Sequence, residues 1–308
     1  MKQVQVLLSS YNGEDYISDQ LQSILKQSYP HISVLVRDDG STDQTQALLK
    51  EYTIAHSDRI KVITGRNIGV VSSFFELVQQ SDPHADYYCF CDQDDVWLEQ
   101  KIERAVSMLS SQAYHIPAMV FTSTELTDKD LNSLGTWPKA PLKEPSFYNA
   151  LVQNIAVGAT ITINRAARNK FIEGNQTDPN KIIMHDWWFY LLVSGFGNVM
   201  YDKNPSILYR QHENNVVGGS NSLFNKLKQK YRSYIKYKGK HLLIKQASEF
   251  YRVYGHLMDN EKREQLELFI ALRERVREKI YFLSRSKLYR QSIIEQLLFR
   301  FLILVGYI

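Results

Sequence analysis

Three carboxylates stand within four residues of one another in the segment Asp92-Gln93-Asp94-Asp95, directly after the apolar run 86–90. Like charges this close repel each other unless a cation lies between them. Hard divalent ions such as Mg²⁺ and Mn²⁺ bind carboxylate oxygens together with phosphate oxygens. The alternative is an acidic turn that caps a helix beginning at Trp97, for which Asp95 alone would be enough. Because three carboxylates exceed what a cap needs, the segment predicts a divalent metal site.

A second acidic segment, Asp38-Asp39-Gly40-Ser41-Thr42-Asp43, follows another apolar run at 32–36. Gly40 permits a tight turn, and Ser41 or Thr42 would cap the helix that follows. A carboxylate at this place can also accept the N3–H of a pyrimidine base, and we favour Asp39 for this. The chain has neither of the Gly-rich phosphate-binding patterns G-x-G-x-x-G and G-x-x-x-x-G-K-[ST]. A bound nucleotide diphosphate would therefore be held through a metal ion.

Alternating strand and helix patterns must position these two acidic segments. Apolar runs predict strands at 3–8, 32–36, 60–63 and 86–90, and helical spacing predicts helices at 15–26, 42–52, 70–80 and 97–109. Such alternation indicates a parallel, doubly wound sheet, in which ligands bind beyond the carboxyl ends of the strands. The polar segments 9–13, 38–43, 67–69 and 92–95 all follow predicted strands. One pocket could draw on all of them.

The regular alternation of strands and helices ends in the second half of the chain. Strands are expected at 118–122, 159–164, 199–201 and 207–210, helices at 147–153 and 184–193, and a polar hairpin or loop at 128–134. Beyond 220 only helices are expected, at 223–240, 241–257, 261–283 and 287–304. We therefore divide the chain into a catalytic domain at 1–220 and a separate helical appendage at 221–308. Within the first, about 1–115 would bind the donor and about 116–220 the acceptor.

The catalytic domain and the helical appendage also differ in net charge. Residues 222–308 carry 19 Lys/Arg and 8 Asp/Glu, whereas residues 1–221 carry 18 and 25. A basic tail suggests an anionic partner, and with its apolar end at 297–308 it favours association with a membrane surface. Oligomerisation is the alternative. Nucleic acid is not expected, because no recognition motif accompanies the charge.

The remaining features of the sequence predict a cytoplasmic protein. The N-terminus lacks the apolar stretch of a signal peptide, and no apolar run is long enough to span a bilayer. Cys89 and Cys91 lie two residues apart in a predicted strand, which suits packing better than a disulfide. Both are expected to be buried thiols.

The chain resembles glycosyltransferase family 2, whose fold is called GT-A. Six segments carry the resemblance and follow the family's order: Leu7–Gly13, Arg37–Asp43, Asn67–Gly69, Cys91–Trp97, His185–Trp188 and Tyr209–Asn215. The resemblance implies an α/β fold with a mostly parallel sheet flanked by helices, to which the C-terminal helices are appended. The forms Asp-Gln-Asp-Asp-Val-Trp and Tyr-Arg-Gln-His are similar to those of bacterial rhamnosyltransferases that use dTDP-L-rhamnose.

For the donor, the resemblance implies particular roles. Ser10 and Tyr11 would line the base and ribose pocket, and Asp39 would read the base. Asn67 would also bind the donor. Among the acidic residues the family uses one carboxylate on the ribose and another on a Mn²⁺ or Mg²⁺ ion. We assign Asp92 and Asp94 to the donor and Asp94, Asp95 and His212 to the metal, with the division among the three carboxylates left open. A solvated loop histidine is the alternative for His212.

For the acceptor, the resemblance implies a catalytic base. Asp186 would take the proton of the acceptor hydroxyl in an inverting transfer. The family usually has Glu-Asp here, whereas this chain has His185-Asp186. Asp186 could equally be a first-turn residue of its helix. Trp187 and Trp188 are candidates for an aromatic floor under the acceptor sugar, and the alternative for such residues is the core face of the helix.

The expected function is transfer of a sugar, L-rhamnose by this resemblance, to a lipid-linked saccharide of the cell wall. The enzyme would be peripheral on the inner face of the membrane. Two alternatives remain: a UDP-hexose donor in capsule or exopolysaccharide synthesis, and a non-catalytic scaffold of an assembly complex.

Overall fold

A seven-stranded sheet forms the centre of the computed structural model, which describes residues 2–174, 176–211 and 241–307. The strand order is β10-β6-β9-β4-β1-β2-β3. The strands are β1 (Val4–Ser10), β2 (Ile32–Asp38), β3 (Ile60–Thr64), β4 (Tyr87–Cys91), β6 (Ala118–Thr122), β9 (Thr162–Asn164) and β10 (Asn198–Asp202). Neighbours pair in parallel except at β9, which runs antiparallel to both β4 and β6. The predicted mostly parallel sheet is confirmed.

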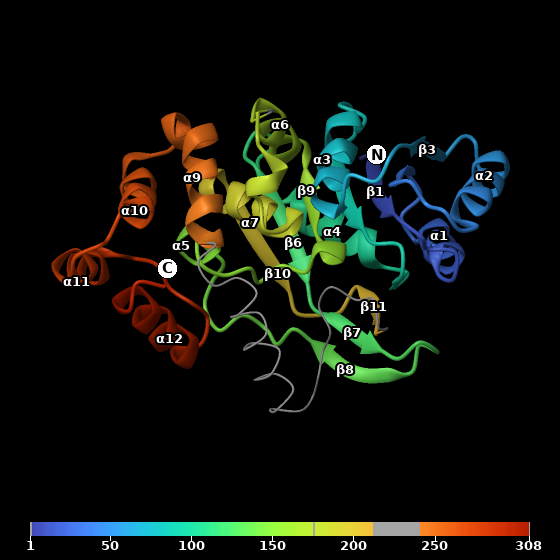
Figure 1. Ribbon diagram of the computed structural model, residues 1–308. Helices are drawn as coiled ribbons and strands as arrows, with labels where there is room; N and C mark the ends of the chain where they lie inside the picture. Colours follow the sequence, from blue (N-terminus) through green and yellow to red (C-terminus); the bar gives the residue numbers. More distant parts are fainter. Residues whose placement is uncertain (1, 175, 212–240, 308) are drawn as a thin grey trace.

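Helices cover both faces of this sheet (Figure 1). They are α1 (Ile17–Leu25), α2 (Thr45–Ala55), α3 (Val70–Gln80), α4 (Lys101–Ser110), α5 (Phe147–Ala150), α6 (Arg165–Glu173) and α7 (His185–Phe196). Successive residues of a strand point to opposite faces. Leu7 of β1 accordingly packs with α3 and α7, while Val6 and Leu8 pack with α1 and α4. Because both faces of β1 are buried, its residues Val6, Leu7 and Leu8 are consecutive apolar residues without alternation.

A smaller sheet lies beyond the central one (Figure 1), in the order β5-β11-β7-β8. Its strands are β5 (Val96–Trp97), β7 (Thr124–Thr127), β8 (Ser133–Trp137) and β11 (Ile207–Arg210). The predicted hairpin at 128–134 joins β7 to β8. The prediction that a helix begins at Trp97 is wrong, since Trp97 pairs with β11 and α4 begins at Lys101.

The C-terminal region is helical, as predicted. Its elements are α9 (Leu242–Tyr254), the 3₁₀ turn Gly255–Leu257, α10 (Asn260–Ile270), α11 (Val276–Arg285) and α12 (Ile293–Leu304). The single helix predicted over 261–283 is in fact two. The Arg273 guanidinium donates to the carbonyls of Phe269 (2.6 Å) and Ala271 (2.9 Å), so it satisfies acceptors that the end of α10 leaves open. The helix predicted at 223–240 lies outside the described residues.

The C-terminal helices share the hydrophobic core of the catalytic fold. Phe250 and Tyr254 of α9 lie against Trp188 of α7, with ring centroids 5.4 and 6.2 Å apart. Phe282 of α11 and Phe299 of α12 belong to the same buried cluster. The predicted domain boundary near 220 falls outside the described residues. Buried residues from before and after this gap belong to one hydrophobic core.

None of the helices in the described ranges combines the length and the apolar character needed to cross a membrane. Cys89 and Cys91 are both buried and unbridged on β4, as expected.

Candidate active site

A cavity of about 850 Å³ opens at the carboxyl ends of β1, β2 and β4. The predicted donor residues Tyr11, Asp39, Asn67, Asp92 and Asp94 line one side of it. Segments from the second half of the chain form the other side, where the predicted base Asp186 also lies. Residues far apart in the sequence thus meet in one cavity, as the strand-end argument predicts.

Gln93 fastens the loop after β1 to the acidic segment. Its Oε1 accepts from the Ser10 hydroxyl and from the Tyr11 amide, both at 2.8 Å, and its Nε2 donates to the Tyr11 carbonyl at 3.0 Å. Ser10 is buried beneath the loop and does not line the cavity, whereas its neighbour Ser9 does. A side chain at Gly13 would collide with Gln93. The sequence alone does not reveal this role of Gln93, because its partners are more than 80 residues away.

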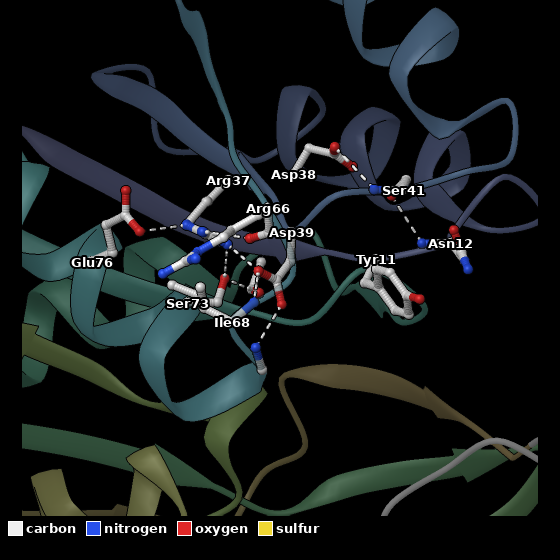
Figure 2. A network of polar contacts seen from close by, with 12 residues as sticks. Tyr11, Asn12, Arg37, Asp38, Asp39, Ser41, Arg66, Ile68, Ser73 and Glu76 are labelled. Atoms are coloured by element: carbon white, nitrogen blue, oxygen red, sulfur yellow. Dashed lines mark hydrogen bonds and ion pairs between the residues drawn. The ribbon is translucent and has the colours of Figure 1, made fainter. Parts of the chain in front are cut away.

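Asp39 is the centre of a buried polar network (Figure 2). Its Oδ1 accepts from Arg37 Nη1 at 2.5 Å and from the Ile68 amide at 2.8 Å, and its Oδ2 accepts from the Gly69 amide at 3.0 Å. Arg37 also donates to Glu76 at 2.8 Å. A carboxylate offers about four acceptor positions. These three hydrogen bonds fix the orientation of Asp39 and leave one position for a ligand.

The hydrogen bonds of the turn after β2 differ from the helix cap that the sequence predicts. Gly40 adopts φ +82°, so the tight turn is confirmed. However, α2 begins at Thr45, and its first amide donates to Asp43 Oδ1 at 3.0 Å. Ser41 Oγ instead accepts from the Asn12 amide at 2.9 Å. The prediction that Ser41 or Thr42 caps this helix is therefore wrong.

The three carboxylates of the acidic segment have different surroundings. Asp92 and Asp94 line the cavity, and burial, with Asp94 and Asp186 nearby, raises the pKa of Asp92 to about 7. Asp95 is buried away from the cavity lining, and its Oδ1 accepts from the amide of Arg210 in β11 at 3.3 Å. Burial, then Asp94 and Asp92, raise the Asp95 pKa well above its ordinary value. Asp95 does not cap α4, which starts at Lys101.

The residues present fit a divalent cation bound jointly with a ligand. Within 2–174, 176–211 and 241–307, no group of three His, Cys, Asp or Glu side chains is arranged to hold a metal by itself. Mg²⁺-type sites need only one or two carboxylates when phosphate oxygens complete the shell. Asp92 and Asp94, which both face the cavity and repel each other when ionised, are suited to that shared mode. His212 lies outside the described residues.

Asp186 occupies the first turn of α7 at the cavity wall. Its Oδ1 accepts from the Trp187 amide at 2.6 Å, and the Asn154 side chain and the Gly158 amide also stabilise its charged form. Burial nevertheless outweighs these interactions and raises its pKa to about 6. The first-turn and catalytic readings of Asp186 are therefore compatible. A carboxyl with this pKa is ionised near neutrality yet is a better base than an ordinary aspartate.

His185, beside the base, is buried and lines the cavity. Its ring stacks on Phe74, with centroids 3.8 Å apart, and meets Phe90 edge-on. Burial lowers its pKa to about 3, so the imidazole is neutral at working pH. Neither ring nitrogen has a hydrogen-bond partner among the described residues. His185 thus places a neutral donor and acceptor next to Asp186.

The predicted aromatic floor is wrong for Trp188, whose ring is fully buried against α9. Trp187 also does not line the cavity, and its indole N–H donates to the Ala150 carbonyl at 2.6 Å. Besides Tyr11 and His185, the aromatic residues that line it are Trp137 and Tyr209, with ring centroids 6.0 Å apart. They come from β8 and β11, so only the pairing of the smaller sheet reveals them.

The fold and this arrangement of carboxylates define a class of enzyme. The model of the family described as Glycosyl transferase family 2 matches residues 5–172. The chain belongs to this family and is a glycosyltransferase with the GT-A fold.

Three individual proteins show what this chain is similar to. The dTDP-rhamnosyl transferase RfbG of Shigella flexneri is 30% identical over 234 residues, which cover 72% of this chain and 77% of RfbG. The UDP-Glc:alpha-D-GlcNAc-diphosphoundecaprenol beta-1,3-glucosyltransferase WfgD of Escherichia coli is 29% identical over 170 residues, covering 54% and 62% of the two chains. The crystal structure of S. aureus TarS 1-349 with UDP has the same fold, with a TM-score of 0.57 at 17% identity, covering 88% of this chain and 70% of that one.

Proposed function

We propose that this protein is an inverting, metal-dependent glycosyltransferase that moves L-rhamnose from dTDP-L-rhamnose to a hydroxyl of a lipid-linked saccharide in cell-wall polysaccharide synthesis. One observation carries the reaction type. The donor-side carboxylates Asp92 and Asp94 and the buried carboxyl of Asp186 line the same cavity from different parts of the chain.

Asp186 acts as the general base. The acceptor oxygen attacks the anomeric carbon, Asp186 takes the proton from that oxygen, and the bond between the sugar and the nucleotide diphosphate breaks. The pKa near 6 suits this role, because the group is ionised at neutral pH and still accepts a proton readily. No covalent intermediate with the protein is needed.

Asp92 and Asp94 would hold a Mn²⁺ or Mg²⁺ ion together with the donor diphosphate. A bound divalent ion supplies charge neutralisation for the departing diphosphate. The burial of Asp95 and its hydrogen bond to Arg210 favour a supporting role for Asp95 over metal ligation. His212 remains the further ligand that the family pattern suggests.

The base of the donor would lie over the loop after β1. Tyr11 and Asn67 line this part of the cavity, and Asp39 has one acceptor position left for the N3–H of thymine or uracil. Because the two bases present the same edge to Asp39, this contact does not select dTDP over UDP. The resemblance to RfbG favours dTDP-L-rhamnose, and the resemblance to WfgD keeps a UDP-hexose as the alternative.

The acceptor would enter past Trp137 and Tyr209, whose rings can pack on the apolar C–H face of a sugar. WfgD is named for an acceptor on diphosphoundecaprenol, which supports a lipid carrier for the present acceptor too. We place the enzyme on the cytoplasmic face of the membrane, held there by its C-terminal helices. A homodimer is the alternative use of those helices.

A panel of nucleotide sugars tests the proposal by thermal stabilisation in the presence of Mn²⁺ or Mg²⁺. A ligand present at 100 times its Kd stabilises the folded state by about 2.7 kcal/mol. We expect a selective rise in melting temperature with dTDP-L-rhamnose and its loss on addition of EDTA. A selective rise in melting temperature with a UDP-hexose would show that the donor is this UDP-hexose and would leave the proposed reaction type unchanged. If no donor binds or is hydrolysed with either metal, the result favours the alternative of a non-catalytic scaffold.

A further inference from the structure

Helix α12 presents an uncovered apolar face. It buries only Phe299 and Ile303, while Ile293, Ile294, Leu297, Leu298, Phe301 and Leu304 are between 44% and 80% exposed. Their spacing places them along one broad side of the helix. An exposed apolar patch of this kind marks an interaction surface.

The neighbouring helix α11 extends the patch. Lys279 Nζ of α11 donates to the Leu304 carbonyl of α12 at 3.1 Å, which joins the two helices. Val276, Ile280 and Tyr281 of α11 are exposed as well. Figure 1 shows α11 and α12 at the end of the molecule opposite α1 and α2. We call the exposed apolar residues of these two helices the α11–α12 surface.

The positive charge around the α11–α12 surface favours an anionic partner. Residues 271–307 carry eight Lys/Arg and three Asp/Glu. Arg277, Arg285 and Arg300 are exposed on or beside the two helices. An anionic lipid surface complements such a basic, apolar patch. A second copy of the chain would bring like charges together, so charge disfavours a symmetric dimer through the same face.

The α11–α12 surface continues into the active-site cavity. Ser292 and Glu295 line the cavity, and Ile293 and Ile294 of the same helical turn belong to the surface. The Lys143 amide donates to Gln291 Oε1 at 2.8 Å, which fastens the segment after β8 to the start of α12. Trp137 at the end of β8 and Pro138, Ala140 and Leu142 of this segment form a mainly apolar wall of the cavity, in which Lys139 is the charged residue.

We propose that the α11–α12 surface lies flat in the interface of an anionic bilayer and turns the apolar end of the cavity toward the lipid, so that a polyprenyl-linked acceptor reaches Asp186 without leaving the membrane. The 12 residues of α12 span about 18 Å, against about 30 Å for the bilayer core, so the helix lies in the interface. This inference rests on the proposed function, whose acceptor it describes.

Vesicle flotation tests the inference with the full-length protein. We compare vesicles of phosphatidylcholine alone with vesicles that contain phosphatidylglycerol as well. The wild type should float with the anionic vesicles, less so in high salt. The double variant Leu297→Glu, Phe301→Glu should lose at least tenfold in vesicle affinity. Ile54→Glu, at an exposed apolar position on α2, is the matched control and should bind as the wild type does.

A transfer assay separates the inference from the proposed function. The ratio of turnover on a polyprenyl-linked acceptor in vesicles to turnover on a short-chain acceptor should fall at least tenfold in the double variant. A wild type that transfers sugar but ignores anionic vesicles would overturn the inference and leave the proposed function standing. A dimer in solution that the double variant dissociates would also overturn it. A wild type that floats but transfers no sugar would instead remove the proposed function.

Discussion

Asp186 illustrates how position sets the chemistry of a single side chain. The amide of Trp187 and two further groups favour its ionised form, yet burial in the cavity wall raises its pKa to about 6. The pKa of the neighbouring His185 is shifted in the opposite direction, to about 3, because burial disfavours the charged form of its imidazole. At neutral pH the pair is therefore a carboxylate beside a neutral imidazole.

This pair predicts the pH dependence of the reaction. The base must be ionised, so at a saturating Mn²⁺ concentration, which keeps Asp92 ionised, kcat/KM should be flat above pH 7 and fall tenfold per pH unit below about pH 6, where Asp186 becomes protonated. His185 should add no step, because it stays neutral throughout this range. Initial rates from pH 4.5 to 8 at subsaturating substrate measure the profile. A profile that stays nearly flat down to pH 4.5, as expected for an unperturbed aspartate with a pKa of about 4, would contradict the raised pKa.

Residue types in the motifs could be predicted from the sequence, whereas their surroundings could not. The spacing of Asp92, Asp94 and Asp95 indicated an acidic site, but only the fold shows that Asp95 turns away toward Arg210. Trp188 had the residue type expected of a sugar platform and is instead a core residue of α7. Such distinctions depend on which side of a helix meets a neighbouring element, and that neighbour, α9, lies some 60 residues along the chain.

At the scale of elements, the Arg37 guanidinium joins β2, α3 and the loop before α3. It is buried, and it pairs with Asp39 at 2.5 Å and with Glu76 at 2.8 Å (Figure 2). It also donates to the Arg66 carbonyl at 3.3 Å. One cation thus holds the proposed base-binding carboxylate in place.

Replacing this cation should be costly. Arg37→Leu leaves the buried Asp39 without its charge partner, and breaking a buried pair in this way costs about 3–5 kcal/mol of folding stability. Urea unfolding at pH 7 measures the loss. Lys50→Leu, at an exposed position on α2, serves as the control and should change stability by less than about 0.5 kcal/mol. Equal stabilities of the two variants would show that Arg37 is not the organising charge.

Elements with strong local patterns could be predicted, and those defined by distant pairing could not. The β-branched and apolar runs of β1 to β4 carry their own signal, and α3 runs over the predicted residues 70–80. The strand expected at 159–164 is confirmed for the three residues of β9, which pair with β4 and β6. β5 has two residues and exists only through β11, more than 100 residues away.

At the scale of the whole molecule, the basic C-terminal region is packed into the catalytic fold. Phe250 and Tyr254 cover Trp188, and a side chain at Gly174 of the catalytic part would collide with Tyr254. Composition changes at about residue 220, and this change suggested an appendage. Charge composition describes the surface, whereas the packing of the buried aromatic residues determines what folds together.

Truncation tests this coupling. A chain of residues 1–220 would expose the face of α7 that α9 covers, so we expect no cooperative thermal unfolding and a tendency to aggregate. Circular dichroism during heating measures it. In the full-length chain, Phe250→Ala should cost about 3–5 kcal/mol through the cavity it leaves, and Ile54→Ala on the exposed side of α2 should cost little. A stable, cooperative fragment would support the predicted division at residue 220.

The most direct test of the central claim is sugar transfer by Asp186→Asn. Asparagine keeps the size of the side chain but cannot take a proton, so turnover should fall by about 10²–10⁴-fold. The Kd for the nucleotide-sugar donor, measured with Mn²⁺ by calorimetry, should stay within about twofold of the wild type. If the variant keeps full turnover, Asp186 is not the base. If it loses donor binding in the same proportion, its role is to bind the donor.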